Sequence, residues 1–313
     1  MMERRVVIIG AGHVGSHCAW SIALQGICSE VILLDCVPGK ADAQARDVSD
    51  GLVFYPAAAR VRAGDYEDVP AAQLVILAIG MPRKPGQTRL DMLDDSIVML
   101  RDVTEHLRTV GVGGIVLSIT NPADVIADRL RKDLGLPRSR VFSTGTALDT
   151  ARMRRIVAGK AGVAPSAVQG VCMGEHGDSS MVPFSALTVA GLPFAAYQAL
   201  HPECGLQEEE IMHLVRQEGM DIIEGKASTE FGIGAVAAAF VQAILLDRKQ
   251  LLPASVLLQG EYGLRDIHLG VPCVIGAGGV EEIIALPLTE PEQALLDRAA
   301  DVVRTYISRA AGL

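Results

Sequence analysis

One histidine, His176, lies in a sequence context that could support proton transfer. The octet at residues 173–180 reads MGEHGDSS and places this histidine between two glycines and two carboxylates. Imidazole has an unperturbed pKa close to neutrality, so it can give or take a proton at working pH. The glycines let the backbone turn sharply and let another molecule approach. Because most histidines near acids are only hydrogen-bonded, the octet needs support from the rest of the chain.

Asp149 and Arg152 form a second pair that could do chemistry. They are three residues apart in a segment, residues 144–155, where we expect a helix to begin, so they share one helical face. An acid and an arginine on a buried face both need partners. The pair could be a self-contained salt bridge. Alternatively, Arg152 could bind a carboxylate while Asp149 orients a histidine.

A glycine-rich loop at residues 10–15 follows the Gly-x-Gly-x-x-Gly pattern. It lies between a predicted buried strand at residues 5–9 and a predicted helix at residues 14–24. A second predicted strand, residues 30–35, ends in Asp35. Strand, glycine loop, helix, strand and carboxylate occur in the order that a dinucleotide-binding unit requires.

Each glycine of such a unit, and its terminal carboxylate, has a physical role here. Gly10 permits the tight turn, Gly12 lets the backbone approach a pyrophosphate, and Gly15 lets helix and strand pack closely. The start of the helix supplies backbone N–H groups and a positive dipole end. Asp35 can accept hydrogen bonds from ribose hydroxyls and would repel a 2′-phosphate, and no arginine follows at residues 36–37. The cofactor that we expect is therefore NAD.

His13 and Val14 lie inside the same loop, and we expect them to contact the cofactor with the glycines. His13 and His17 are four residues apart, a spacing that can bind a metal. No glutamate joins them in an H-E-x-x-H pattern. We therefore expect no metal site.

Polar segments follow the next two predicted strands, residues 73–78 and 114–119. Residues 81–89 contain three cations and two prolines, which is typical of either a lid with inward-pointing arginines or a solvated loop. Asn121 precedes a proline, so it should be extended. Its amide could reach a substrate oxygen or a nicotinamide, or could only form an Asx-turn. Ligands bind at this carboxyl edge in doubly wound sheets.

The order of elements predicts an α/β fold. We expect a doubly wound parallel Rossmann sheet that binds NAD over residues 1–143. An α+β substrate and catalytic domain should follow over residues 144–313, with antiparallel strands at residues 251–258 and 268–275. We also expect a strand over residues 168–173 and a helix over residues 227–246. A terminal helix at residues 289–310 should begin with a capping box.

Composition limits the classes of protein to which the chain can belong. Of its 313 residues, 50% are hydrophobic and 21% are charged, so it can bury a large core. Its 28 basic and 37 acidic side chains give a net charge of −9, which disfavours nucleic-acid binding. Six cysteines form no C-x-x-C pair, and the N-terminal apolar run is too short for a signal or a membrane span. We expect a soluble cytoplasmic protein that does not bind membranes.

Taken together, these motifs resemble the L-lactate and malate dehydrogenase family, nearly end to end. The resemblance includes the glycine loop, Asp35, RKPGQTR at 83–89, TNP at 120–122, LDTAR at 148–152 and GEHGD at 174–178. It implies an NAD-dependent L-2-hydroxy acid dehydrogenase, which moves a hydride reversibly between NADH and a small 2-oxo acid. A homodimer or homotetramer is also implied.

The resemblance implies a role for each of three residues in the second half. His176 would be the general base in hydroxy-acid oxidation and the general acid in the reverse direction. Asp149 would hold its imidazole and stabilise the imidazolium. Arg152 would bind the substrate C1 carboxylate through two parallel N–H···O bonds, which lysine cannot reproduce.

Further substrate contacts are implied on other segments. Arg89 would polarise the C2 carbonyl, and Asn121 would hydrogen-bond the same region and the cofactor. Thr229 lies in a Thr-x-x-Gly-Ile pattern, similar to the lactate branch, and would contact the substrate.

The preferred acid stays open between pyruvate, oxaloacetate and branched 2-oxo acids. Arg83 occupies the specificity position where malate enzymes carry arginine, and Gly219 stands where lactate enzymes tend to have alanine. Both favour a dicarboxylate. The sequence around Asp149 and His176 instead resembles the lactate and L-2-hydroxyisocaproate branch. An unpaired arginine in a closed site is costly, so we expect oxaloacetate to be turned over at least as well as pyruvate.

Activation by fructose 1,6-bisphosphate is expected to be weak or absent. Many bacterial lactate enzymes bind it through an arginine and a histidine. Arg154 matches the arginine, but Gln169 stands where the histidine would be.

Two other classes of protein share parts of this pattern. NAD-dependent glycoside hydrolases use a cysteine and a histidine on a divalent metal, and no such motif occurs here. A non-catalytic NAD-binding protein would not need His176, Asp149, Arg89 and Arg152 together.

Overall fold

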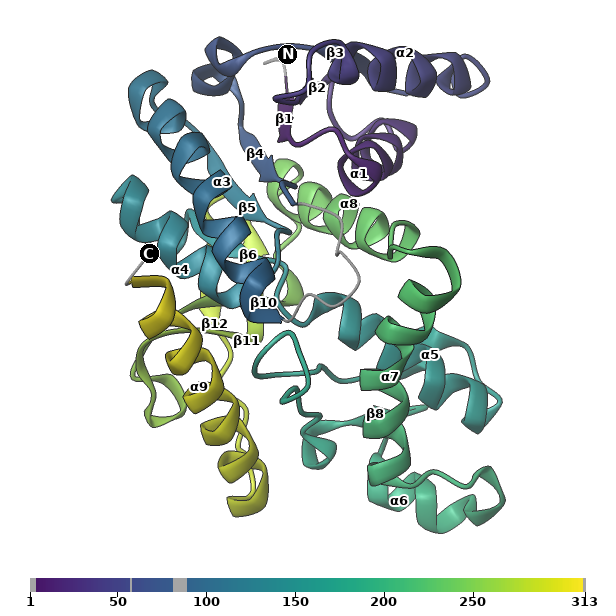
Figure 1. The fold of residues 1–313 in the computed structure, drawn as a ribbon. Helices are drawn as coiled ribbons and strands as arrows, with labels where there is room; N and C mark the ends of the chain where they lie inside the picture. The colour runs from purple at the N-terminus through teal and green to yellow at the C-terminus, as the bar shows by residue number, and fades with distance from the viewer. Residues whose placement is uncertain (1–3, 57, 81–88, 312–313) are drawn as a thin grey trace.

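A single large sheet runs through the molecule (Figure 1). The computed structural model describes residues 4–56, 58–80 and 89–311, with the backbone alone for residues 89–92. Within these residues the sheet has nine strands in the order β12-β11-β10-β6-β5-β4-β1-β2-β3. A separate antiparallel sheet of three short strands has the order β7-β8-β9.

The first six strands of the large sheet are parallel and confirm the predicted Rossmann topology. Their near-continuous apolar sequences suit strands that helices cover on both faces. The strands are β1 (Arg5–Ile9), β2 (Glu30–Leu34), β3 (Arg60–Ala63), β4 (Leu74–Leu77), β5 (Ile115–Ser118) and β6 (Val141–Ser143).

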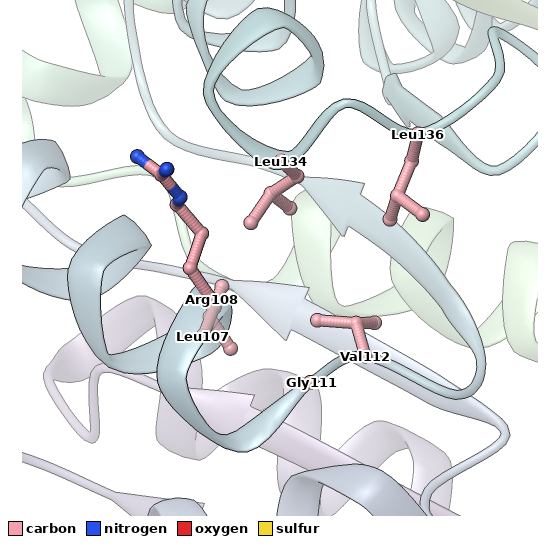
Figure 2. A pocket seen from close by; sticks show the side chains of 6 residues that line it. All are labelled: Leu107, Arg108, Gly111, Val112, Leu134 and Leu136. Atoms are coloured by element: carbon pink, nitrogen blue, oxygen red, sulfur yellow. The ribbon is translucent and has the colours of Figure 1, made fainter.

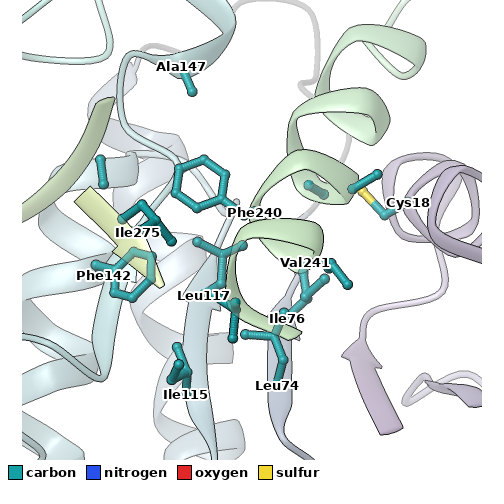
Figure 3. Close-up of a cluster of buried hydrophobic side chains, with 14 of the residues drawn as sticks. Cys18, Leu74, Ile76, Ile115, Leu117, Phe142, Ala147, Phe240, Val241 and Ile275 are labelled. Atoms are coloured by element: carbon teal, nitrogen blue, oxygen red, sulfur yellow. The ribbon is translucent and has the colours of Figure 1, made fainter. Parts of the chain in front are cut away.

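Helices cover the two faces of the parallel strands. Side chains of α1 (His13–Leu24), α2 (Lys40–Leu52) and α8 (Phe231–Leu245) fill one apolar cluster. Those of α3 (Arg89–Val110) and α4 (Ala123–Leu134) fill a second cluster on the other side. The sequence prediction includes neither α2 nor α4. Figure 3 shows the first cluster, in which Phe142 of β6 lies 6.1 Å from Phe240 of α8 between ring centroids.

The predicted antiparallel strands are present and continue the parallel sheet. They are β10 (Gln250–Gln259), β11 (Arg265–Gly276) and β12 (Gly279–Ile283). Ser255 of β10 pairs with Ser143 of β6, so one hydrogen-bonded sheet spans both predicted halves of the chain.

The remaining elements complete the second half. They are α5 (Ala147–Ala161), β7 (Val168–Gln169), β8 (Thr188–Val189), β9 (Leu192–Pro193), α6 (Phe194–Leu200), α7 (Glu208–Lys226) and α9 (Glu290–Ala311). Short 3₁₀ turns lie at Tyr66–Ala71, Pro165–Ala167, Phe184–Ala186, Pro202–Cys204 and Glu261–Gly263. The predicted capping box is confirmed, because Thr289 and Glu292 exchange side-chain and backbone hydrogen bonds before α9.

Two predicted boundaries are wrong. The strand expected over residues 168–173 ends at Gln169, and Met173 then forms only an isolated bridge with Met181. The helix expected over residues 227–246 begins at Phe231. Ala227 has a left-handed backbone (φ 72°) that ends α7 instead.

None of the helices in the described part of the chain combines the length and the apolar character of a membrane span. All six cysteines lie in that part and carry free thiols, four of them buried.

Candidate active site

The glycine loop joins β1 to α1 at the carboxyl edge of the sheet. Gly10 has φ +103° and donates its N–H to the carbonyl of Leu34 at 2.8 Å. A Cβ on Gly10 would clash with the carbonyl oxygen of Ala78, and a Cβ on Gly15 would clash with that of Gly10. These two glycines are therefore required by packing, as the sequence pattern predicts.

Gly12, by contrast, faces open space. A Cβ there would meet only the Nζ of Lys40, at 4.0 Å. The backbone just before α1 is therefore accessible, where helix N–H groups favour an anion. This open backbone, framed by two obligatory glycines, fits the pyrophosphate of a dinucleotide.

Asp35 is held at the end of β2. Its Oδ2 accepts the N–H of Ala11 at 2.8 Å, and its Oδ1 accepts the N–H of Val37 at 3.0 Å. Lys40 places its ammonium 3.3 Å from Oδ2. The sequence pattern does not predict this lysine, because it lies five residues beyond the aspartate in α2.

His13 and His17 do not converge on a common ligand. The His13 side chain is 82% exposed and lies 3.7 Å from Glu230, whereas His17 packs its ring edge-on against Phe231. Nδ1 of His17 donates to the backbone carbonyl of His13 at 2.7 Å. Among the residues that the structure describes, no group of three or more His, Cys, Asp or Glu side chains could hold a metal ion.

His176 and Asp149 come together although they are far apart in sequence. Nδ1 of His176 donates to Oδ2 of Asp149 at 2.6 Å. The other carboxylate oxygen, Oδ1, accepts from Nη1 of Arg152 at 3.1 Å. Asp149 therefore forms the predicted bridge to Arg152 and also orients the predicted histidine.

The electrostatics of this trio favour a protonated His176. The negative charge of Asp149 raises the pKa of His176, although burial opposes it. Burial acts to raise the pKa of Asp149, but the charges of His176 and Arg152 together hold it below its ordinary value. With Nδ1 engaged, the ring presents Nε2 on its opposite side as the group that can exchange a proton.

Two further residues border the trio. Gly219 on α7 lies beside Arg152, since a Cβ there would be 3.2 Å from Nη1 of the arginine. The buried carboxylate of Asp124 on α4 accepts the backbone N–H of His176 at 3.0 Å. Sequence reasoning missed Asp124. The available signal was its spacing from Asp128, which puts two acids on one helical face.

Asn121 lies at the carboxyl edge of β5, next to the end of β4. The hydroxyl of Thr120 donates to the carbonyls of Leu77 and Ile79, and Ser96 of α3 donates to the carbonyl of Asn121 at 3.0 Å. The Asn121 side chain is exposed at this edge. Thr229 is half-buried in the loop between α7 and α8.

Two predicted substrate residues cannot be placed. Arg83 lies outside the described residues. Arg89 begins α3, and its side chain also lies outside the described part.

A pocket of about 260 Å³ lies elsewhere, where α3 and α4 end (Figure 2). It is lined by Leu107, Arg108, Gly111, Val112, Leu134 and Leu136. These residues precede β5 and β6, so the pocket is at the opposite edge of the sheet from His176 and is not part of this site.

Two models of known protein families match this chain. The family model for the lactate/malate dehydrogenase NAD binding domain matches residues 4–143. The model for the alpha/beta C-terminal domain of the same enzymes matches residues 146–312. The chain belongs to the lactate/malate dehydrogenase family.

Individual relatives of this dehydrogenase agree with the assignment. It is 39% identical to an L-lactate dehydrogenase of Fusobacterium nucleatum over 98% of this chain and 97% of that enzyme. The minor L-lactate dehydrogenase of Enterococcus mundtii, solved with ligands bound, has a TM-score of 0.94, 36% identity and 99% coverage of both chains. The Cryptosporidium parvum lactate dehydrogenase, solved with lactic acid and nicotinamide adenine dinucleotide, has a TM-score of 0.94 at 28% identity, covering 100% of this chain and 99% of that one.

This dehydrogenase is therefore an NAD-dependent oxidoreductase that acts on 2-hydroxy acids. The interpretations as a glycoside hydrolase or a non-catalytic binding protein are set aside. The glycine loop and Asp35 meet the steric and hydrogen-bonding needs of NAD.

Proposed function

We propose that the enzyme interconverts a small 2-oxo acid and its L-2-hydroxy acid, with His176 as the proton donor and acceptor. The observation that carries this proposal is the Asp149 carboxylate, which binds His176 through one oxygen and Arg152 through the other. The arrangement brings a proton carrier and a carboxylate-binding cation to one place.

Proton transfer follows from the orientation of the ring. In the direction of reduction, protonated His176 gives its Nε2 proton to the C2 oxygen of the substrate. In oxidation, neutral His176 takes that proton from the hydroxyl group. Asp149 stabilises the imidazolium in both directions, because it lies against Nδ1 at 2.6 Å.

Arg152 supports substrate binding. One of its N–H groups donates to Asp149, and the guanidinium has further donors for the C1 carboxylate. Its side chain is only 11% exposed, so water competes weakly for those donors. By resemblance, Arg89 polarises the C2 carbonyl, and Asn121 and Thr229 contact the substrate.

NAD supplies the hydride acceptor or donor when bound. Gly10, Gly12, His13, Val14 and Gly15 would hold its pyrophosphate, and Asp35 would accept hydrogen bonds from ribose. Asp35 already has backbone N–H partners on both oxygens, and these fix its carboxylate.

The preferred substrate is part of the proposal: oxaloacetate is turned over at least as well as pyruvate. Arg83 brings a second positive charge that a methyl group cannot pair, and Gly219 leaves more room beside Arg152 than any larger residue would. The names of the lactate relatives make pyruvate the competing outcome.

We also propose that residues 1–143 bind the cofactor and that residues 144–313 carry the acid–base group, as the distribution of the two sets of residues suggests. Assembly as a homodimer or homotetramer is proposed too. Light scattering on the purified enzyme tests the assembly.

The decisive experiment compares kcat/KM for pyruvate, oxaloacetate and branched 2-oxo acids. The reaction is monitored through the absorbance of NADH. It is repeated with His176→Gln. We expect turnover by the wild type and a loss of at least about a thousandfold in the variant, with NADH binding retained. Full turnover by His176→Gln would remove the basis of the proposal. A large preference for pyruvate would overturn the substrate assignment alone.

A further inference from the structure

Helix α4 turns a buried acidic face toward the loop that carries His176. Asp124 and Asp128 lie one helical turn apart, and each is only 3% exposed. A buried carboxylate is costly unless it has partners, so both acids need a structural or functional reason. Neither takes part in the proton transfer proposed above.

Asp124 contacts His176 directly. Its Oδ2 accepts the backbone N–H of His176 at 3.0 Å, while Asp149 accepts the ring Nδ1–H. The histidine is therefore held at two points by two carboxylates, one on its main chain and one on its side chain. A ring fixed at both points has little freedom to move its Nε2.

Asp128 ties the same helix to strand β11. Its Oδ1 lies 3.2 Å from Nδ1 of His268, a fully buried ring on that strand, and this close polar contact lacks the geometry of a hydrogen bond. Its Oδ2 accepts from Nζ of Lys132 at 2.6 Å. The Asp128–His268 contact thus joins α4 and β11 deep in the protein.

Strand β11 also supports the His176 loop from its other side. Gly270, two residues after His268, exchanges both backbone hydrogen bonds with Gly174, at 2.9 Å each. The short segment from Gly174 to His176 is therefore held by β11 at one end and by Asp124 at the other. The Asp128–His268 contact joins the helix and the strand that provide these two supports.

We propose that Asp124 is a positioning residue for His176, held in register by the Asp128–His268 contact. The inference rests on the proposed role of His176 in proton transfer. Asp124 acts through the main chain of the histidine and sets the position of Nε2 relative to a substrate bound at Arg152. Since Arg152 lies on α5, substrate binding is independent of Asp124 to first order.

Substitutions of Asp124 separate positioning from general structural support. Asp124→Ala removes the acceptor and should lower kcat about a hundredfold, because small displacements of a catalytic group are that costly. Asp124→Asn keeps the shape of the side chain and an acceptor oxygen, so its kcat should be about tenfold higher than that of Asp124→Ala. KM for the 2-oxo acid should stay within about threefold in both variants.

The pH profile gives a readout that a purely structural role would not move. The charged groups that act on His176 are Asp149 and Arg152 of α5 and Asp124 of α4. Because the charge of Asp124 raises the pKa of His176, the apparent pKa in kcat/KM should fall in Asp124→Asn. Asp133→Asn is the matched control. Asp133 lies on the same helix, but its carboxylate pairs with Arg129 and not with His176. Its removal should leave kcat and the pH profile unchanged.

The second arm tests the contact with β11. His268→Asn keeps a polar side chain near Asp128, whereas His268→Leu removes it. We expect kcat of His268→Asn to be several-fold higher than kcat of His268→Leu, and so closer to the wild-type value. Equal kcat in the two variants would show that the Asp128–His268 contact has no positioning role.

The outcome is distinguishable from failure of the proposed function. If His176→Gln is inactive while Asp124→Ala and Asp124→Asn keep the wild-type kcat and pH profile, the positioning role is wrong and the proposed function stands. If His176→Gln keeps full turnover, the proposed function itself fails. Where Asp124→Ala does not fold, Asp124→Asn decides.

Discussion

Nδ1 of His176 lies 2.6 Å from Oδ2 of Asp149, although 27 residues separate them in the sequence. The contact depends on α5, whose first turn carries the aspartate, and on a loop that Gly174 opens with φ +89°. It makes the imidazolium the favoured form of the histidine at pH values where an unpaired histidine would already be neutral.

Asp149→Asn should impair both the rate and its pH dependence. The amide cannot stabilise the imidazolium and can select the wrong tautomer, so kcat for 2-oxo acid reduction should fall by about 10²–10⁴. In the wild type, reduction needs protonated His176, and its rate should decline only as pH rises through a pKa above the ordinary 6.5. In the variant that decline should move to lower pH. Steady-state rates from pH 5 to 9 check both effects, and an unmoved profile would contradict the assignment.

Asp124→Asn should stabilise the enzyme while slowing it. Burial raises the pKa of Asp124 from 3.8 to about 6, so ionising it in the folded state costs about 3 kcal/mol at most. This penalty is fully present above pH 6 and disappears as pH falls through 3.8, because the carboxyl group is then protonated in both the folded and the unfolded state. We expect the free energy of unfolding to rise by about 1–3 kcal/mol at pH 8. Urea denaturation at pH 8 and pH 4 measures it, and an equal gain at both would exclude ionisation as the cause.

Gly10→Ala and Gly12→Ala should separate folding from cofactor binding. The alanine at residue 10 needs φ +103° and clashes with Ala78, so it should lower the free energy of unfolding by about 2–4 kcal/mol. Gly12 has φ −73°, which alanine adopts readily, and open space around its Cβ position. Gly12→Ala should therefore keep the wild-type stability but weaken NADH binding about tenfold or more. Thermal melts and NADH fluorescence titrations distinguish them, and unchanged NADH affinity in Gly12→Ala would place the pyrophosphate elsewhere.

Arg83→Gln should shift substrate preference toward pyruvate. Removing the charge that we assign to the second carboxylate should lower kcat/KM for oxaloacetate about a hundredfold and leave that for pyruvate similar or higher. Arg46→Gln, on the exposed surface of α2, is the control, since its guanidinium pairs with Asp42. If the ratio of the two substrates is the same in Arg83→Gln and the wild type, Arg83 does not contact the substrate.

Fructose 1,6-bisphosphate should have little effect on the rate. Arg154 donates from Nε and Nη2 to the carbonyl of Gly170 at 3.1 and 3.0 Å, so two of its donor groups are already used in hydrogen bonds within the protein. Gln169 donates to the carbonyl of Ser166 and adds no charge. Initial rates at low enzyme concentration should change less than about twofold when the sugar phosphate is added. A strong activation would show that another cation binds it.

The sequence predicts the parts of this enzyme that local pattern determines. The strand, glycine loop and helix at residues 5–24 follow from apolar periodicity and turn chemistry, and so does the capping box at Thr289. Lys40 beside Asp35 and Asp124 beside His176 were not predicted. Both depend on contacts between separate elements. The spacing of Asp124 and Asp128 marks two acids on one helical face, but it does not specify that His176 is the partner.

The predicted boundary between two helices is wrong where the backbone conformation of a single residue ends a helix. The expected helix includes residues 227–230, yet Ala227 ends α7 in the left-handed region. The predicted antiparallel strands were correct, but their attachment to β6 depends on one long-range pair, Ser143 with Ser255. Hydrophobic pattern alone does not specify such a partner.

That pair has a consequence for any attempt to express the first half alone. A chain that ends after β6 would leave the backbone N–H and C=O groups of that strand without the neighbour that β10 provides. Phe142, which packs near Phe240, would also lose its cover. A bare apolar edge of this kind is a template for another strand, so the isolated half would be prone to pair with copies of itself and aggregate. The two halves of this dehydrogenase share one sheet and protect each other from association.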